Sequence, residues 1–152
     1  MKARSIGGLR YYFAYGSNMH LTRMRARCPR AILMGAGVVR GWRLCERIHA
    51  DIEKTTRWGS LVWGGVWLID RGDEEALERY EGVAGGYYSK EVVRVELKDG
   101  RVVPAMVYIM TPEAREFRSG GGFSPSYREV CREGAKMLGI PIWRGYSAPG
   151  SK

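Results

Sequence analysis

The chain has 152 residues, of which 45% are hydrophobic and 27% charged, and these values are typical of a single soluble domain that spans residues 1–152. Its net charge of +9 suits anionic partners, but the 19 arginines and 6 lysines are spread along the whole sequence, so nucleic-acid binding is not favoured. No apolar run reaches the roughly 20 residues of a membrane span, and the basic N-terminus lacks the apolar core of a signal peptide, so we expect a cytoplasmic protein without a membrane partner.

The hydrophobic pattern divides the chain into short strands and three helices. In chain order it predicts a strand at 11–16, a helix at 21–27, a bent strand at 32–50, a loop at 51–59, a strand at 61–70, a helix at 74–80, strands at 88–98 and 101–110, and a helix after the glycines at 120–122. Asp73 can cap the middle helix and Gly82 can end it. In the strand at 88–98, Val93, Val95 and Leu97 alternate with charged residues that face the other way. Ser124 before Pro125, or Ser126 with Glu129, can cap the last helix. The Asp99-Gly100 pair is a strong signal for a hairpin.

The order of these elements favours an α+β domain over a doubly wound parallel sheet. The strands follow one another in the middle of the chain, which indicates a mostly antiparallel and strongly curved sheet. Gly64 and Gly65, inside an apolar strand, indicate a bulge or a close approach of another segment. We expect flexible ends at about 1–9 and 144–152.

The first candidate site is the turn Tyr15-Gly16-Ser17-Asn18-Met19, directly after an apolar strand. Glycine permits a tight turn, and serine and asparagine tolerate unusual backbone angles. Successive N–H groups in such a turn can bind an anion. The same residues also fit an ordinary turn between a strand and a helix.

The second candidate is Glu81, which stands where the middle helix is predicted to end and is followed by glycines and aromatic residues. The negative end of the helix dipole and partial burial among tyrosines both favour the protonated form of a carboxyl group. A carboxyl group in such surroundings can transfer protons near neutral pH. Taken alone, it could equally be a solvated residue at a helix end.

Taken together, the segments resemble the γ-glutamylcyclotransferase-like (AIG2-like) family. Residues 15–19 look like the Tyr-Gly-Ser-Asn-Leu loop of that family, with methionine in place of leucine, and 81–88 look like its Glu-Gly-Val segment. Residues 62–67 (VWGGVW) are similar to its Val-Trp-Gly-x-Val-Trp strand, and 124–141 to its C-terminal helix. Because the four matches occur in the order of the family, they are far more specific together than singly.

The resemblance implies a small, mixed, mostly antiparallel β-barrel flanked by helices, with the substrate at one mouth of the barrel. It also implies that Glu81 is the general acid/base and that Tyr88 and Tyr127 line the pocket. The γ-glutamyl group would be held through its carboxylate and carbonyl by the backbone of Tyr15, Gly16, Ser17, Asn18 and Met19.

The implied reaction closes a small-molecule γ-glutamyl substrate into 5-oxoproline and releases an amine. The α-amine of the substrate attacks its own γ-carbonyl, so no enzyme nucleophile is required. One carboxylate can remove a proton from the attacking amine and return it to the leaving amine. The 3 cysteines and 2 histidines do not cluster, and we therefore expect neither a metal nor a cofactor.

Two other functions remain open at this point. A protein of this fold could bind a small γ-glutamyl-like ligand without catalysis, although the presence of Glu81 argues against it. A basic nucleic-acid-binding module is the other alternative, but Trp63 and Trp67 lie in an apolar strand and are expected in the core. The identity of the leaving amine and the choice between monomer and homodimer are left open, and residues 40–59 match the family less clearly.

Overall fold

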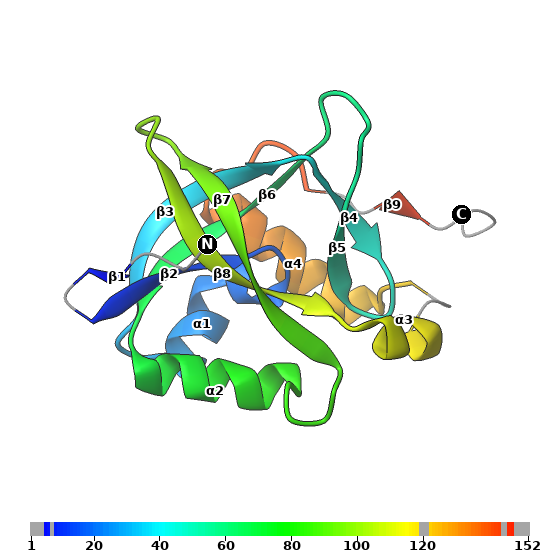
Figure 1. The fold of residues 1–152 in the computed structure, drawn as a ribbon, viewed down its shortest axis with the longest axis horizontal. Coiled ribbons are helices and arrows are strands. Elements are labelled where there is room, and N and C mark those ends of the chain that lie inside the picture. The colour runs from blue at the N-terminus through cyan, green and yellow to red at the C-terminus, as the bar shows by residue number, and fades with distance from the viewer. Residues whose placement is uncertain (1–4, 7, 119–121, 144–145, 148–152) are drawn as a thin grey trace.

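In the part of the chain that the structure describes, five strands close into a barrel and four α-helices lie outside it (Figure 1). The computed structural model describes residues 5–6, 8–118, 122–143 and 146–147. The described strands are β1 (Ser5–Ile6), β2 (Leu9–Ala14), β3 (Ile32–Arg40), β4 (Trp42–Glu46), β5 (Ala50–Lys54), β6 (Leu61–Ile69), β7 (Tyr88–Leu97), β8 (Val102–Met110) and β9 (Tyr146–Ser147). The helices are the 3₁₀ turn η1 (Ser17–Met19), α1 (Leu21–Arg27), α2 (Arg71–Glu81), α3 (Pro112–Arg118) and α4 (Pro125–Met137).

The barrel strands follow the order β2-β6-β3-β7-β8, and a parallel pairing of β8 with β2 closes the ring. The other pairings in the ring are antiparallel. The predicted fold class, a mixed and mostly antiparallel barrel flanked by helices, is therefore confirmed. A second sheet, β5-β4-β9, stands beside the barrel.

Barrel strands are covered on both faces. Inside, the valines of β6, β7 and β8 pack against Tyr11 and Phe13 of β2. Outside, Tyr12 and Met106 pack against Leu77 of α2. A strand that is buried on both faces carries apolar side chains on both, which explains why β2, β6 and β8 are largely apolar runs in the sequence.

Several sequence predictions hold in the structure. In β7, Val93, Val95 and Leu97 are buried while the residues between them face outward. Ser124 caps α4 by accepting a hydrogen bond from the N–H of Tyr127. The αL conformation of Gly82 ends α2, as expected.

The prediction of a loop at 51–59 is wrong for its first half, which forms β5. Asp51 made this segment look polar, but its carboxylate is fully buried between Arg47 and Arg115. The predicted bent strand at 32–50 is also wrong as a single element, because Gly41, with a φ of 83°, separates β3 from β4.

The structure corrects or refines smaller points of the prediction. The N-cap of α2 is Asp70, and Asp73 instead completes a reciprocal capping box with it. Of the two possibilities given for Gly64 and Gly65, the close approach is confirmed at Gly64, since a Cβ there would lie 2.5 Å from the carbonyl oxygen of Ala14, whereas the bulge in this strand pair lies in β3. Helix α3 was not predicted.

Of the ends expected to be flexible, residues 5, 6, 8 and 9 belong to the paired strands β1 and β2 and their turn. Residues 1–4, 7, 144–145 and 148–152 lie outside the described residues. Within the part of the chain that the structure describes, no helix is both long enough and apolar enough to cross a membrane.

Candidate active site

A cavity of about 550 Å³ opens at the end of the barrel where β2 and β8 end and β7 begins. Its walls come from these strands, η1, α1, the turn between β4 and β5, the end of α2 and the first half of α4. Segments far apart in the sequence thus meet at one end of the barrel.

The cavity brings together most of the residues singled out from the sequence. Its lining includes Tyr15, Gly16, Ser17, Asn18, Glu81, Tyr88 and Tyr127. Met19 does not line it. That side chain has no exposed surface and instead packs with Cys131 and Ala135 of α4. The side chain of Met19 therefore anchors the turn rather than facing the cavity.

The turn between β2 and α1, which lines the cavity, leaves two backbone donors without a partner in the described part of the chain. It closes through hydrogen bonds from the N–H of Met19 to the carbonyl oxygen of Gly16 and from the N–H of His20 to that of Ser17. Among the described residues, the N–H groups of Ser17 and Asn18 have no acceptor, as is usual at the first positions of a helical turn. These two donors are available to a negatively charged group.

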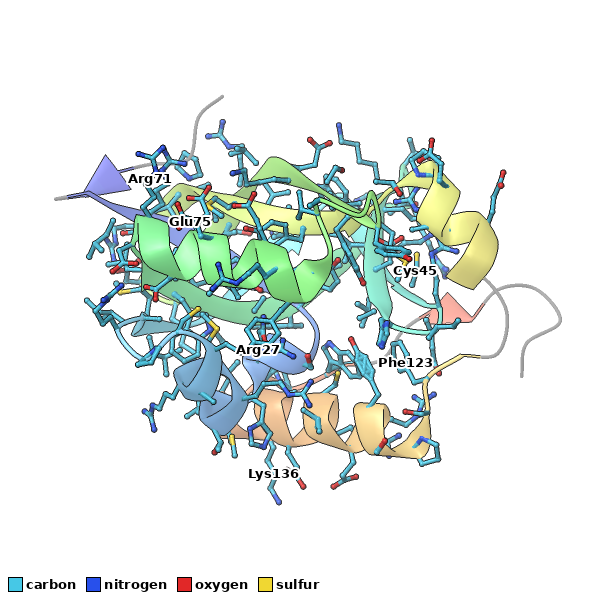
Figure 2. All side chains as sticks on the ribbon, turned by 90° about the horizontal axis from the view of Figure 1, so that it is seen from below. Arg27, Cys45, Arg71, Glu75, Phe123 and Lys136 are labelled. Carbon is cyan, nitrogen blue, oxygen red and sulfur yellow. The ribbon has the colours of Figure 1, made fainter. Side chains whose placement is uncertain are left out.

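The side chain of Asn18 holds the turn in place. It is buried, donates from Nδ2 to the hydroxyl of Tyr12 (3.1 Å) and accepts at Oδ1 from Nη1 of Arg27 (2.8 Å). Arg27 in turn stacks on the ring of Tyr80, 4.3 Å from its centroid. Figure 2 shows the Arg27 side chain in the space between α2 and α4. This chain of contacts ties the turn to the end of α2, next to Glu81.

Glu81 is the last residue of α2 and lies partly buried on the cavity wall. Burial and, after it, the charge of Glu81 raise the pKa of Tyr12. The same carboxylate contributes to the raised pKa of Tyr15 and of Tyr108, for which burial is again the largest cause. All three tyrosines line the same cavity as Glu81, and the negative charge of its carboxylate disfavours ionisation of their hydroxyls.

Tyr88 and Tyr127 stand on different elements around the cavity. Tyr88 begins β7 and is buried, and Tyr127 lies in the first turn of α4. The hydroxyl of Tyr127 accepts a hydrogen bond from the N–H of Ala50 (3.1 Å), so α4 is joined to the turn between β4 and β5. A Cβ on Gly16 would lie 3.0 Å from that hydroxyl, which explains why a residue without a side chain fits there.

Sequence reasoning missed several residues of the cavity. Tyr12 and Tyr108 belong to continuous apolar strands, where a tyrosine is first interpreted as core. The hydroxyl of Tyr108 is buried without a hydrogen-bond partner among the described residues, and such a group on a cavity wall can bind a ligand. Arg23 and Arg27 resembled any charged residues of a short helix. The one available signal was their spacing of four, which places them on one helix face.

No group of three or more His, Cys, Asp or Glu side chains that could hold a metal ion occurs among the described residues. The three cysteines are buried, and burial raises the pKa of Cys28 and Cys131 to about 12 and that of Cys45 to about 11. Their thiols are therefore poor candidates for nucleophiles.

Comparison with known proteins agrees with this arrangement. The model of the AIG2-like family matches residues 61–143. The chain is 31% identical to a γ-glutamylcyclotransferase of Mus musculus over 140 residues, which cover 86% of this chain and 72% of the relative, and 29% identical to the γ-glutamylcyclotransferase of Homo sapiens with the same coverage.

Solved structures give the same result. A γ-glutamyl cyclotransferase structure superposes with a TM-score of 0.74 at 25% identity and covers 93% of this chain and 91% of its own. A human protein solved as uncharacterized shares the fold, with a TM-score of 0.76 at 24% identity, covering 95% of this chain and 93% of its own. The chain therefore belongs to the γ-glutamylcyclotransferase-like (AIG2-like) family and is a cyclotransferase-type enzyme.

Proposed function

We propose that the enzyme converts a γ-glutamyl compound to 5-oxoproline and a free amino acid or amine, with Glu81 as the general acid/base. One observation carries this proposal. Among the described residues that line the cavity, Glu81 is the sole carboxylate, and it shares the cavity with the N–H groups of the turn at 15–18. The names of the relatives in Mus musculus and Homo sapiens support the same reaction.

The proposed reaction proceeds in two steps. The neutral α-amine of the substrate attacks the γ-carbonyl carbon, and Glu81 accepts a proton from the attacking nitrogen as the new C–N bond closes a five-membered ring. The bond between that carbon and the leaving nitrogen then breaks, and Glu81 returns the proton to the leaving amine. The reactants and products balance without an oxidant, a hydrolytic water or a second substrate.

The turn supplies the electrostatic part of the mechanism. The N–H groups of Ser17 and Asn18 can donate to the oxygen that becomes negative when the amine attacks. The anchoring of Asn18 by Tyr12 and Arg27 fixes these donors before the substrate binds. The proposal needs no metal or cofactor, because the nucleophile is tethered to the carbon that it attacks.

The test is release of 5-oxoproline from a panel of γ-glutamyl amino acids and γ-glutamyl amines. We expect turnover by the wild-type enzyme and a fall in kcat of roughly 100- to 10,000-fold in Glu81→Gln, which keeps the size of the side chain but cannot accept the proton. Glu75→Gln is the matched control, because Glu75 is exposed on the same helix and is not among the residues that line the cavity.

Two results would contradict the proposal. Wild-type rates in Glu81→Gln would exclude this residue as the acid/base, even if the enzyme releases 5-oxoproline. Binding of the panel without release from any member would instead favour the non-catalytic alternative.

Other expectations from the sequence stay predictions. They are a single domain over residues 1–152, a cytoplasmic location and a monomer or homodimer. Sedimentation equilibrium of the purified chain would settle the last of these.

A further inference from the structure

Two arginines of α1 line the cavity, and their surroundings differ. Arg23 and Arg27 are four residues apart and lie on the same face of the helix. Arg27 is partly buried and engaged, through its hydrogen bond to Asn18 and its stacking on Tyr80. It therefore belongs to the frame of the site.

Arg23 is exposed and has neither a hydrogen-bond nor an ion-pair partner in the part of the chain that the structure describes. Eight other arginines of that part form ion pairs with carboxylates, mostly on the outer surface. An arginine on a cavity wall that forms no such ion pair is available for an anionic group of a ligand.

The positive charge of Arg23 affects the pKa values of two other residues. Burial raises the pKa of Cys131 to about 12, while the hydroxyl of Tyr127 and then the charge of Arg23 act in the opposite direction. Burial and then Arg23 lower the pKa of Arg27. The charge of Arg23 thus acts both on Arg27 of α1 and on Cys131 of α4, and Arg23 lines the cavity together with Tyr127 and Val130 of α4.

The residues that line the cavity differ in their exposure to solvent. Tyr88 is buried, Glu81 is partly buried and Arg23 is exposed, so Tyr88 lies at the closed end of the cavity and Arg23 at its solvent-exposed mouth. If Glu81 gives its proton to the leaving nitrogen, the rest of the leaving group must continue toward the mouth, where Arg23 lies.

From this arrangement we propose that Arg23 binds the carboxylate of the leaving amino acid and so makes the enzyme selective for γ-glutamyl-α-amino acids over γ-glutamyl amines that lack a carboxylate. The inference rests on the proposed function. It goes further because it assigns a second anion-binding subsite, separate from the turn at 15–18, and names the residue that determines substrate specificity. The planar guanidinium suits a carboxylate because it can donate two parallel hydrogen bonds.

The experiment uses two substrates that differ only in that carboxylate, γ-glutamylalanine and γ-glutamylethylamide. We expect the wild-type enzyme to favour γ-glutamylalanine by roughly 10- to 100-fold in kcat/KM, the effect typical of a hydrogen-bonded charged group. In Arg23→Gln the ratio of the two values should fall toward one, and Arg23→Lys should restore part of it, because lysine keeps the charge without the planar fork.

Arg25→Gln is the matched control. It removes the same charge from the same helix, but Arg25 is exposed and is not among the residues that line the cavity. The wild-type ratio should persist in this variant. If Arg25→Gln lowered the ratio as much as Arg23→Gln, the preference would reflect general attraction by the positive surface and the subsite would be refuted.

Two further outcomes would overturn the inference. An equal loss for both substrates in Arg23→Gln would mean that Arg23 binds the glutamyl part or acts structurally. Equal kcat/KM values for both substrates in the wild-type enzyme would mean that no carboxylate subsite exists.

A binding measurement separates this inference from the proposed reaction. Calorimetric titration of Glu81→Gln with each compound reports affinity without turnover. Absence of 5-oxoproline from every substrate refutes the proposed reaction, whereas equal affinity for γ-glutamylalanine and γ-glutamylethylamide refutes the role of Arg23.

Discussion

Gly134 of α4 offers a sharp test of how the turn at 15–18 is held, because α4 packs against it without a side chain between them. A Cβ at position 134 would lie 2.5 Å from the backbone nitrogen of His20 and 2.7 Å from the carbonyl carbon of Met19, whereas ordinary contacts begin at 3.4 Å. Since both obstacles are backbone atoms, Gly134→Ala must move the turn or the helix by about 0.9 Å, the difference between 3.4 Å and 2.5 Å.

The two effects of this substitution have opposite signs. Alanine in a helix is favoured over glycine by up to about 1 kcal/mol. Overpacking of a filled site costs about 1–3 kcal/mol, and the upper part of that range applies because the backbone cannot rotate away as a side chain does. We therefore expect Gly134→Ala to lose about 1–2 kcal/mol, which corresponds to a fall in Tm of about 2–8 °C.

Activity should respond more strongly than stability. A displacement on the order of 1 Å at catalytic groups can cost roughly 100-fold in rate, and the displaced atoms here are continuous with the proposed N–H donors of Ser17 and Asn18. Urea unfolding gives the free energy of unfolding, and 5-oxoproline release gives kcat/KM for the same preparations. Loss of activity with unchanged KM would locate the effect in the reaction step.

Gly72→Ala is the matched control, because Gly72 lies in the first turn of α2 and the nearest obstacle to its Cβ is the end of the exposed Arg30 side chain, at 2.9 Å. That side chain can move, so we expect unchanged activity and a free energy of unfolding that is equal or higher by up to about 1 kcal/mol. If Gly134→Ala proved as stable and as active as the wild-type enzyme, the close packing of α4 against the turn would be refuted.

Two further predictions concern buried groups. Asp51→Asn should lower the free energy of unfolding by about 3 kcal/mol in urea unfolding, because it removes the buried carboxylate charge that pairs with both Arg47 and Arg115. The exposed Asp99→Asn, which loses one ion pair at the surface, should change the free energy of unfolding little, and equal effects of the two substitutions would contradict the reasoning. Burial raises the pKa of Cys28 and Cys131 to about 12, so a thiol reagent at pH 8 should label the folded enzyme slowly. In denaturant the same reagent should label all 3 cysteines, whereas rapid labelling of the native protein would show that a thiol is accessible.

Local signals predicted those parts of the fold that local physics determines. The alternation of valines in β7, the Asp-Gly hairpin and the serine cap of α4 each depend on residues within a few positions of one another. The closure of the barrel does not. The parallel pairing of Tyr12 in β2 with Met106 in β8 joins strands more than ninety residues apart, and only the family resemblance implied it.

The prediction failed where a polar residue is buried with its partners. Asp51 resembled a loop residue, because two of the groups that bind its carboxylate, Arg115 and the N–H of Met110, lie far from it in the sequence. Its carboxylate accepts hydrogen bonds from Arg47 and Arg115 and from the N–H of Met110, at 2.9–3.0 Å. Burial of a charge is favourable only when such partners are in place, and their placement is a property of the whole fold.

The geometry of the site likewise depends on residues that lie far from the motif in the sequence. The motif at 15–18 supplies the backbone donors, but three separate segments hold them still. Arg27 of α1 fixes the side chain of Asn18, Gly134 lets α4 approach the turn, and the indole N–H of Trp143 donates to the carbonyl oxygen of Tyr15 at 2.8 Å.

These three supports come from outside the barrel and from both ends of the chain. A chain that kept the motif and Glu81 but replaced Arg27 or Gly134 would keep the reacting groups and lose their alignment. Because misalignment of well-placed groups can cost as much rate as the loss of one of them, these supports should limit the tolerated substitutions as strictly as the residues of the motif.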